Sequence, residues 1–344
     1  MLHVALVGAG GMARLYRKVY ATLPGVELTV AIDLHADQLQ ACRDLGAKRV
    51  STEFGAALAA DIDLVDISTP NHLHEEQAIA ALNAGKHVLL QKPMANSLKA
   101  ADHILAVAAK STGKLGMYMS SYTNPLMWEI KRIVDGGFIG KVQSVRARDA
   151  HTGGMKAAPN AGNWRGDRNL TGGGSFVQLS IHAINLMQWW LGASITEVFA
   201  YSANQYSPNM GGDDVTVAVA KFGSGVYGTF DSGWASEGMT REIYGTQGSI
   251  RLIKYDEELE ILLDRPFEGQ GINYQTPGKV AAFPAPGHVL DDISNPLNQQ
   301  RMFIEAIAAG KPAHMTGAAG RQDLAVVAAA YRSVETKRPE VVGR

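Results

Sequence analysis

Cysteine is nearly absent from this sequence, and so are the charge runs and long apolar segments that mark several classes of protein. The one cysteine, Cys42, excludes an intramolecular disulfide framework and suits a reducing compartment. A formal charge of −1, from 32 basic and 33 acidic residues without a basic run, argues against nucleic-acid binding. No secretory leader pattern precedes the first apolar run. We therefore expect a cytoplasmic protein that binds neither nucleic acid nor membrane.

What is present suits a soluble chain of two domains. The 344 residues are 46% hydrophobic and 19% charged, which is typical of globular proteins. The first part alternates short apolar runs, typical of buried strands, with helical segments that contain periodic apolar residues. Strands are expected at 2–7, 26–33, 62–69, 86–93 and 114–120, and helices at 36–47, 71–85 and 96–110. Strands joined through helices predict a parallel sheet covered on both faces.

The composition of the sequence changes after Ser120, where glycine and short strand-like segments become frequent. Further strands are expected at 142–150, 195–203, 214–222, 225–233 and 248–254, and a helix-rich tail from Gln299. We therefore predict an N-terminal Rossmann domain over residues 1–121 and an α+β domain over residues 122–344.

The first strand is followed by the fingerprint G-A-G-G-M-A. Gly8 permits a tight turn, Gly10 admits a pyrophosphate, and Ala13 lets a helix pack closely. The helix expected to begin near Met12, with Gly11 just before it, offers free amides to phosphates. Asp33 lies 33 − 10 = 23 residues after Gly10, a spacing that suits contact with the ribose hydroxyls. The pattern predicts NAD rather than NADP, because a carboxylate repels a 2′-phosphate. The alternative is a simple glycine turn with Asp33 as a helix cap.

Two later strand ends carry further candidates for the cofactor site. Ser68, Thr69, Pro70 and Asn71 either line the cofactor groove or cap the next helix, and both roles are compatible. His74 is assigned to the same site. A metal is not expected, because His72 and His74 have no third ligand nearby and no cysteine pair.

The stretch VLLQKPMA, residues 88–95, places a lysine at the end of an apparent core strand. Lys92 is either a solvated loop charge or a group at the carboxyl edge of a parallel sheet, where such folds bind ligands. Gln91, just before it, is assigned to the cofactor site.

A charge-free stretch, residues 169–196, is interrupted by glycines and polar groups, so it predicts a buried helix rather than a membrane span. Gln178, His182 and Asn185 recur at i, i+4 and i+7, on one face of that helix. Such neutral polar groups are costly to bury without partners, so we expect them to meet either a ligand or other core hydrogen-bonding groups.

Three stretches together resemble the Gfo/Idh/MocA family of glucose–fructose oxidoreductase and inositol dehydrogenase relatives. They are VGAGGMA, DISTPNHLHEEQAIAALNAGKHVLLQKPMA and GGGSFVQLSIHAINLMQWWLG. The resemblance implies a Rossmann domain, then an α+β domain with a large, mostly antiparallel sheet. It also implies NAD(P)-dependent oxidation or reduction of a sugar, inositol or related polyhydroxylated compound.

The resemblance assigns roles to particular residues. Lys92 occupies the place of the lysine that reaches the reacting hydroxyl in a Glu-Lys-Pro motif, although Gln91 replaces the glutamate. His182 occupies the place of the histidine that contacts the substrate hydroxyl. Gln178 and Asn185 replace carboxylates usual in the family, so the proton transfer is left to Lys92 and His182.

Weaker candidates for substrate contact are Trp164 and Arg165, which suit stacking on and hydrogen bonding to a sugar. The alternative for this pair is a core tryptophan and a surface charge. Tyr122 lies where the family often has an aromatic residue after an arginine, and here Ser121 replaces that arginine.

The favoured function is an NAD-dependent dehydrogenase or reductase of a polyol or sugar. One alternative is a redox-neutral enzyme that uses tightly bound NAD transiently, in glycoside cleavage or epimerisation. The other is a non-catalytic NAD- or sugar-binding protein. A broad second sheet needs its outer face covered, so we expect a homodimer or homotetramer.

Overall fold

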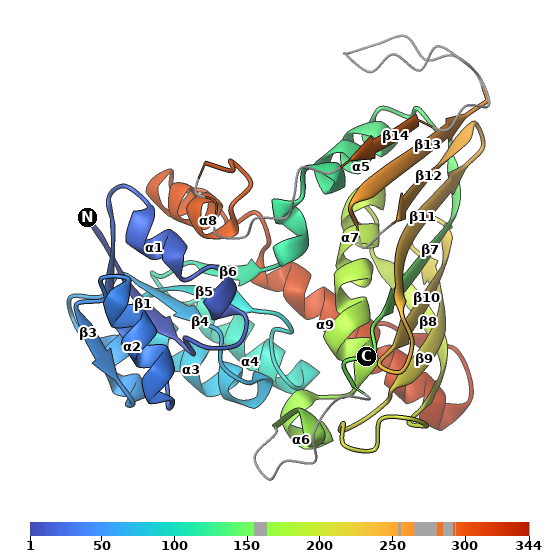
Figure 1. Ribbon diagram of the computed structural model, residues 1–344. Helices are drawn as coiled ribbons and strands as arrows, with labels where there is room; N and C mark the ends of the chain where they lie inside the picture. Colours follow the sequence, from blue (N-terminus) through green and yellow to red (C-terminus); the bar gives the residue numbers. More distant parts are fainter. Residues whose placement is uncertain (155–163, 254–255, 265–280, 285–291, 293, 344) are drawn as a thin grey trace. The chain divides into compact units, whose positions relative to one another are not determined.

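The computed structural model describes residues 1–154, 164–253, 256–264, 281–284, 292 and 294–343 (Figure 1). The chain forms two compact units. The first consists of Met1–Thr123 and Val289–Arg321, and the second of Asn124–His288 and Gln322–Arg344. The first unit thus ends two residues after the predicted boundary at 121, and it also takes a segment from the C-terminal part of the chain.

The first unit is built on a parallel sheet with the strand order β3-β2-β1-β4-β5-β6. Its strands are β1 (Leu2–Val7), β2 (Val26–Ile32), β3 (Arg49–Ser51), β4 (Leu64–Ile67), β5 (His87–Gln91) and β6 (Leu115–Tyr118). The order reverses between β1 and β4, and a parallel sheet binds ligands at the carboxyl ends of its strands near such a point. The Rossmann-type fold predicted from the sequence is confirmed.

Helices cover both faces of this sheet. They are α1 (Lys18–Thr22), α2 (Ala36–Asp44), α3 (His74–Asn83), α4 (Leu98–Ala108), α8 (Gln299–Ala308) and the start of α9 (Gly317–Thr336). Tyr20 of α1, Cys42 of α2 and Phe303 of α8 belong to one core cluster. Gly116 of β6 admits α8, because a Cβ there would lie 2.7 Å from the Phe303 ring.

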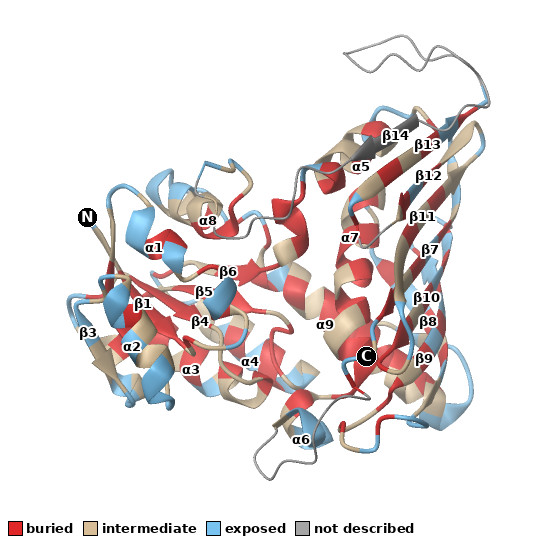
Figure 2. Cartoon of the chain, viewed as in Figure 1, coloured by how far each residue is buried: buried red, intermediate tan, exposed pale blue. Residues whose placement is uncertain are grey.

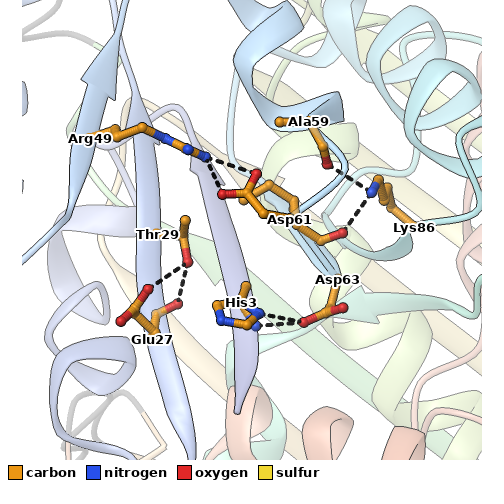
Figure 3. A network of polar contacts seen from close by, with 9 residues as sticks. His3, Glu27, Thr29, Arg49, Ala59, Asp61, Asp63 and Lys86 are labelled. Carbon is orange, nitrogen blue, oxygen red and sulfur yellow. Dashed lines mark hydrogen bonds and ion pairs between the residues drawn. The ribbon is translucent and has the colours of Figure 1, made fainter.

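The amino ends of the strands are closed by polar contacts (Figure 3). The Asp63 carboxylate accepts from the His3 backbone amide at 2.8 Å, and Arg49 pairs with Asp61 at 2.9 Å. The nearly buried Lys86 ammonium donates to the carbonyls of Ala59 and Ile62. These contacts fix the loops at the edge of the sheet opposite to the predicted cofactor turn.

The second unit is built on a mostly antiparallel sheet, and the described strands run in the order β14-β13-β12-β11-β7-β10-β9-β8-β15. They are β7 (Val142–Ala150), β8 (Ile195–Ala203), β9 (Val215–Phe222), β10 (Tyr227–Gly233), β11 (Gly238–Gly245), β12 (Gly248–Ile253), β13 (Glu258–Leu263), β14 (Ala281–Pro284) and β15 (Glu340–Val341). Only β7 and β10 pair in parallel among them. The large mostly antiparallel sheet implied by the family resemblance is confirmed.

One face of this sheet is covered by helices and the other is open (Figure 2). The helices of this unit are α5 (Pro125–Asp135), α6 (Arg168–Thr171), α7 (Ile181–Leu191) and most of α9. Trp190 of α7 is fully buried, and its indole donates to the Met127 carbonyl of α5 at 2.8 Å. The covered face also holds a buried ion pair, in which Arg241 lies 2.5 Å from Asp149.

The expected strands at 142–150 and 195–203 match β7 and β8 residue for residue, and α8 begins at Gln299 as expected. The sequence analysis missed β3, β11, β13, β14 and β15. Gln178, His182 and Asn185 were expected on one face of a single buried helix, whereas residues Phe176–Ser180 form a π-helical turn before α7.

Gly113 gives a test of the packing in the first unit. A Cβ at this position would lie 1.9 Å from the Lys86 carbonyl oxygen, so we expect Gly113→Ala to lower the free energy of unfolding by about 1–3 kcal/mol. Gly55→Ala is the matched control, because a Cβ there meets nothing within 4 Å. Urea unfolding would give the stability of both variants and of the parent protein. A Gly113→Ala variant as stable as the parent would contradict the predicted clash.

Candidate active site

The turn after β1 lies directly against the end of β4. Gly8 has a φ of +82°, and a Cβ there would lie 2.8 Å from the carbonyl carbon of Ser68. The Ser68 amide in turn donates to the Val7 carbonyl at 2.8 Å. Only glycine fits this contact, so the turn and the Ser68–Thr69 peptide form one surface at the carboxyl edge of the sheet.

Asp33 closes the same turn from the end of β2. Its carboxylate accepts the Gly10 amide at 3.1 Å and the His35 amide at 2.9 Å. Gly11 has a φ of +44°, and the space where its Cβ would lie is open. The residues present therefore fit a dinucleotide: glycines leave room for phosphates, and a carboxylate lies at the end of the second strand.

The helix expected to begin near Met12 does begin there, but as a short 3₁₀ turn rather than a continuous α-helix. Ala13–Leu15 form a 3₁₀ turn, Tyr16 has a φ of −134°, and α1 begins only at Lys18. The break falls at Tyr16, whose ring is fully buried and lies 4.7 Å from the ring of Tyr118.

Behind the glycine turn lies a buried carboxylate that the sequence analysis missed. Asp66 of β4 is fully buried and accepts hydrogen bonds from the hydroxyls of Tyr16 at 3.2 Å and Tyr20 at 2.5 Å. The Tyr16 hydroxyl also bonds to Ser68. Burial raises the pKa of Asp66 to about 7, although these hydroxyl donors oppose the rise. The core beneath the turn therefore holds a carboxyl group that titrates near neutral pH.

His74 ties two strand ends together. Its ring is fully buried, with Nε2 2.9 Å from the Thr69 carbonyl oxygen and Nδ1 3.0 Å from that of Pro93. Burial lowers the pKa of His74, although the contacts with these two carbonyls favour the protonated ring. The structure thus places His74 under the loops after β4 and β5, where it supports their backbones.

Lys92 stands at the carboxyl end of β5, partly exposed, and its bond to Pro93 is cis. The side chain of Gln91 turns back and accepts the Lys92 amide at 3.0 Å. Gln91 is 7% exposed, so it acts on the local backbone rather than as an open surface group. The predicted groups Gly8, Asp33, Ser68, Thr69 and Lys92 thus all lie at the carboxyl edge of one sheet.

The predicted polar face of the second unit is only partly open. Gln178 in the π-helical turn and His182 in α7 are half-buried, whereas Asn185 is 4% exposed. The amide of Asn185 donates to Asp323 of α9 at 2.7 Å, and that of Gln188 donates to the same carboxylate at 2.8 Å. Burial raises the pKa of Asp323. A carboxylate therefore lies behind Asn185, on a helix that the sequence analysis did not connect with the site.

The remaining candidates fall in both units. Arg165 is exposed and stacks on Trp164, with its guanidinium carbon 4.5 Å from the ring centre. Tyr122 belongs to the first unit, is 3% exposed and packs edge-on against His314 at 4.7 Å.

Among the described residues no cluster of three or more His, Cys, Asp or Glu side chains could hold a metal ion. None of the helices in the described part of the chain is long and apolar enough to cross a membrane.

Two family models match the chain. Residues 2–119 match the oxidoreductase family with an NAD-binding Rossmann fold, and residues 127–251 match the GFO/IDH/MocA C-terminal domain.

Two individual relatives have low sequence identity to this chain. The chain is 26% identical to levoglucosan dehydrogenase of Pseudarthrobacter phenanthrenivorans, over 76% of this chain and 75% of that protein. It is 24% identical to myo-inositol 2-dehydrogenase of Thermotoga maritima, over 99% and 100%. A structure of levoglucosan dehydrogenase in complex with NADH superposes with a TM-score of 0.87 at 22% identity, covering 100% of this chain and 99% of the other.

The titration of Asp66 predicts a pH dependence of stability. Between pH 3.8 and about 7 the folded protein holds a proton that the unfolded chain has lost, so stability falls as pH rises through this window and is level above it. We expect Asp66→Asn to remove a slope of roughly 1 kcal/mol per pH unit, measured by urea unfolding at several pH values in the window.

Asp61→Asn is the control. Arg49 lowers the pKa of Asp61, so this substitution should change the pH dependence of the unfolding free energy only below pH 3.8. Parallel profiles for the parent protein and Asp66→Asn between pH 3.8 and about 7 would contradict a buried proton on Asp66.

Proposed function

Because this chain belongs to the Gfo/Idh/MocA family of NAD-binding oxidoreductases, we propose that it moves a hydride between NAD and a carbinol or keto carbon of a polyhydroxylated compound. The substrate class is a sugar, an inositol or a related polyol. Relatives named for levoglucosan and myo-inositol support this class.

The observation that carries the proposal is the position of Lys92. It follows β5, the neighbour of β4, and the end of β4 packs on the glycine turn. A cationic side chain at this edge, beside a turn that fits a dinucleotide, suits a group that exchanges a proton with a substrate oxygen.

Oxidation of an alcohol releases a hydride and a proton, and NAD, when bound, supplies the hydride acceptor. Lys92 is proposed to take the hydroxyl proton during oxidation, and its ammonium to polarise the carbonyl during reduction. Gln91 supports the first role, because an amide at this position brings no negative charge that would hold the lysine in its protonated form.

The second unit is proposed to contribute the substrate contacts. His182 is assigned to the reacting oxygen, and Gln178, Asn185, Trp164 and Arg165 to other hydroxyls, with Tyr122 from the first unit. Because Gln178 is a half-buried amide, it can both donate to and accept from hydroxyls, as a neutral polyol requires.

The second unit is also proposed to mediate self-association into a homodimer or homotetramer, in a cytoplasmic setting that suits the single buried Cys42. An apolar patch on the open face of its sheet supports this. The β8–β10 patch consists of Phe199, Tyr201, Val217, Val219 and Tyr227, and Tyr201 pairs with Val217 across the strands. Tyr201 is 73% exposed and Val219 50%. A patch of this kind marks an interaction surface.

If the β8–β10 patch mediates self-association, charged residues placed in it should weaken the oligomer. We expect light scattering to report an oligomer at micromolar concentration, and the double variant Tyr201→Glu/Val219→Glu to shift the mass toward the monomer. Tyr206→Glu, at another exposed tyrosine outside the strands, should leave the mass unchanged. A monomeric parent protein would contradict self-association.

The proposed reaction is tested by nicotinamide absorbance against inositols, aldoses, glycosides and their keto forms, with NAD and NADP in parallel. We expect turnover with NAD, and a loss of at least about 100-fold in kcat for Lys92→Ala, because a positioned acid–base group contributes that much. His182→Gln should also lower kcat.

Lys99→Ala, at an exposed lysine of α4, is the matched control and should keep full activity. Full activity of Lys92→Ala would overturn the assigned role of the lysine. Purified protein that carries NAD but shows no net turnover would instead favour the redox-neutral enzyme.

A further inference from the structure

One buried carboxylate in the second unit gathers an unusual number of donors. Asp213, in the loop between β8 and β9, is 6% exposed. One oxygen accepts the Gly174 amide at 2.9 Å and the Tyr331 hydroxyl at 2.7 Å. The other accepts the Ser175 hydroxyl at 2.8 Å, the Phe176 amide at 2.9 Å and the Thr216 hydroxyl at 2.8 Å. All of these donors are neutral, and together they offset the cost of burying a charge.

The same residue holds three successive residues at the start of the π-helical turn. Its carboxylate binds Gly174 and Phe176, and its backbone carbonyl accepts the Ser175 amide at 2.7 Å. Thr216 of β9 shares the carboxylate, and Ser175 also contacts Ser232 of β10 at 2.9 Å. The beginning of the helical segment is therefore fastened to two strands of the sheet through Asp213.

The contact explains the glycines before the helix. A Cβ at Gly174 would lie 2.0 Å from the Asp213 carbonyl oxygen, and one at Gly173 would lie 2.3 Å from the Tyr331 hydroxyl. Gly212, just before Asp213, would likewise place a Cβ 2.5 Å from the Gly174 amide. The glycines thus permit close backbone contact, and the turn is clamped rather than loose.

The clamp lies a short distance upstream of the groups proposed to meet the substrate. Phe176, held by Asp213, begins the π-helical turn that carries Gln178, and α7 with His182 follows without a break. A π-helical turn changes the direction in which later side chains point, because it departs from the period of the α-helix. The position of Phe176 therefore determines which later side chains, among them Gln178 and His182, lie on the partly exposed face of the helical segment.

We propose that Asp213 is a positioning residue for the reaction proposed above: by holding residues 174–176 against β9 and β10 it directs Gln178 and His182 toward the substrate. The inference rests on the proposed function. A residue that only stabilises the fold would not affect molecules that remain folded. Loss of the hydrogen bonds between Asp213 and residues 174–176, by contrast, should alter the reaction of molecules that remain folded.

Asp213→Asn is the direct test, since the variant keeps the shape of the side chain but turns one acceptor into a donor that faces donors. We expect kcat to fall by about tenfold or more at a temperature well below the melting point, because small misplacements of reacting groups carry such costs. The Kd for NADH should change less than about twofold, because the glycine turn and Asp33 lie in the other unit.

A pair of hydroxyl deletions on α9 separates positioning from stability. Tyr331→Phe removes a hydroxyl that donates to Asp213 and lies 3.1 Å from the Gly174 amide. Ser333→Ala removes a fully buried hydroxyl that accepts the Ala200 amide at 2.9 Å and does not touch the turn. Both should lower the melting temperature, but only Tyr331→Phe should lower kcat.

A second measurement needs no substrate. The imidazole of His182 can be followed by NMR of protein labelled in the histidine ring, with its resonance assigned from His182→Gln. We expect Asp213→Asn to shift the resonance and titration of His182, and Ser333→Ala to leave both unchanged.

The outcomes separate the two proposals. If the parent protein turns over no polyol with NAD, the proposed function fails and the NMR comparison still decides the role of Asp213. If Asp213→Asn lowers only the melting temperature, with kcat and the His182 titration unchanged, Asp213 is merely structural and the inference is overturned.

Discussion

Two pieces of backbone can touch only where no Cβ stands between them, and each unit of this chain depends on such a contact. In the first unit, Gly8 lies against the Ser68–Thr69 peptide, which joins the ends of β1 and β4 into one surface. In the second, Gly174 lies against Asp213, which fastens the segment before α7 to the sheet. The residues with proposed chemistry lie on neighbouring elements: Lys92 follows β5, which lies next to β4 in the sheet, and His182 lies in α7, directly after the π-helical turn.

Much of the fold follows from local pattern. The strands β7 and β8 were predicted to the residue because turn residues separate these short strand-like segments from their neighbours. Strand β11 was missed because Arg241, a charged residue, occupies an inward position, and its burial depends on Asp149, which is 92 residues away. A pattern of apolar and polar letters cannot show that a distant carboxylate neutralises an arginine. The π-helical turn was missed for another reason. The expected polar face was assigned with the period of an α-helix, and a π-helical turn departs from that period.

The candidate site was predictable where a motif binds its ligand through backbone, as in the glycine turn with Asp33. The supporting groups were not. Asp66, Asp213 and Asp323 belong to no recognised motif in the sequence, and the role of each depends on partners brought close by folding, such as Tyr16, Tyr331 and Asn185. The amide at residue 185 illustrates the limit: the sequence suggested a lost carboxylate, whereas the structure places one beside it on α9. The roles of Lys92 and His182 remain predictions.

The division of the chain also bears on synthesis. The first unit takes α8 and the start of α9 from residues 289–321, and Phe303 of α8 fills the space over Gly116 of β6. A ribosome therefore completes most of the second unit before it releases the residues that finish the first. A fragment that ends at residue 121 would therefore lack part of its own hydrophobic core.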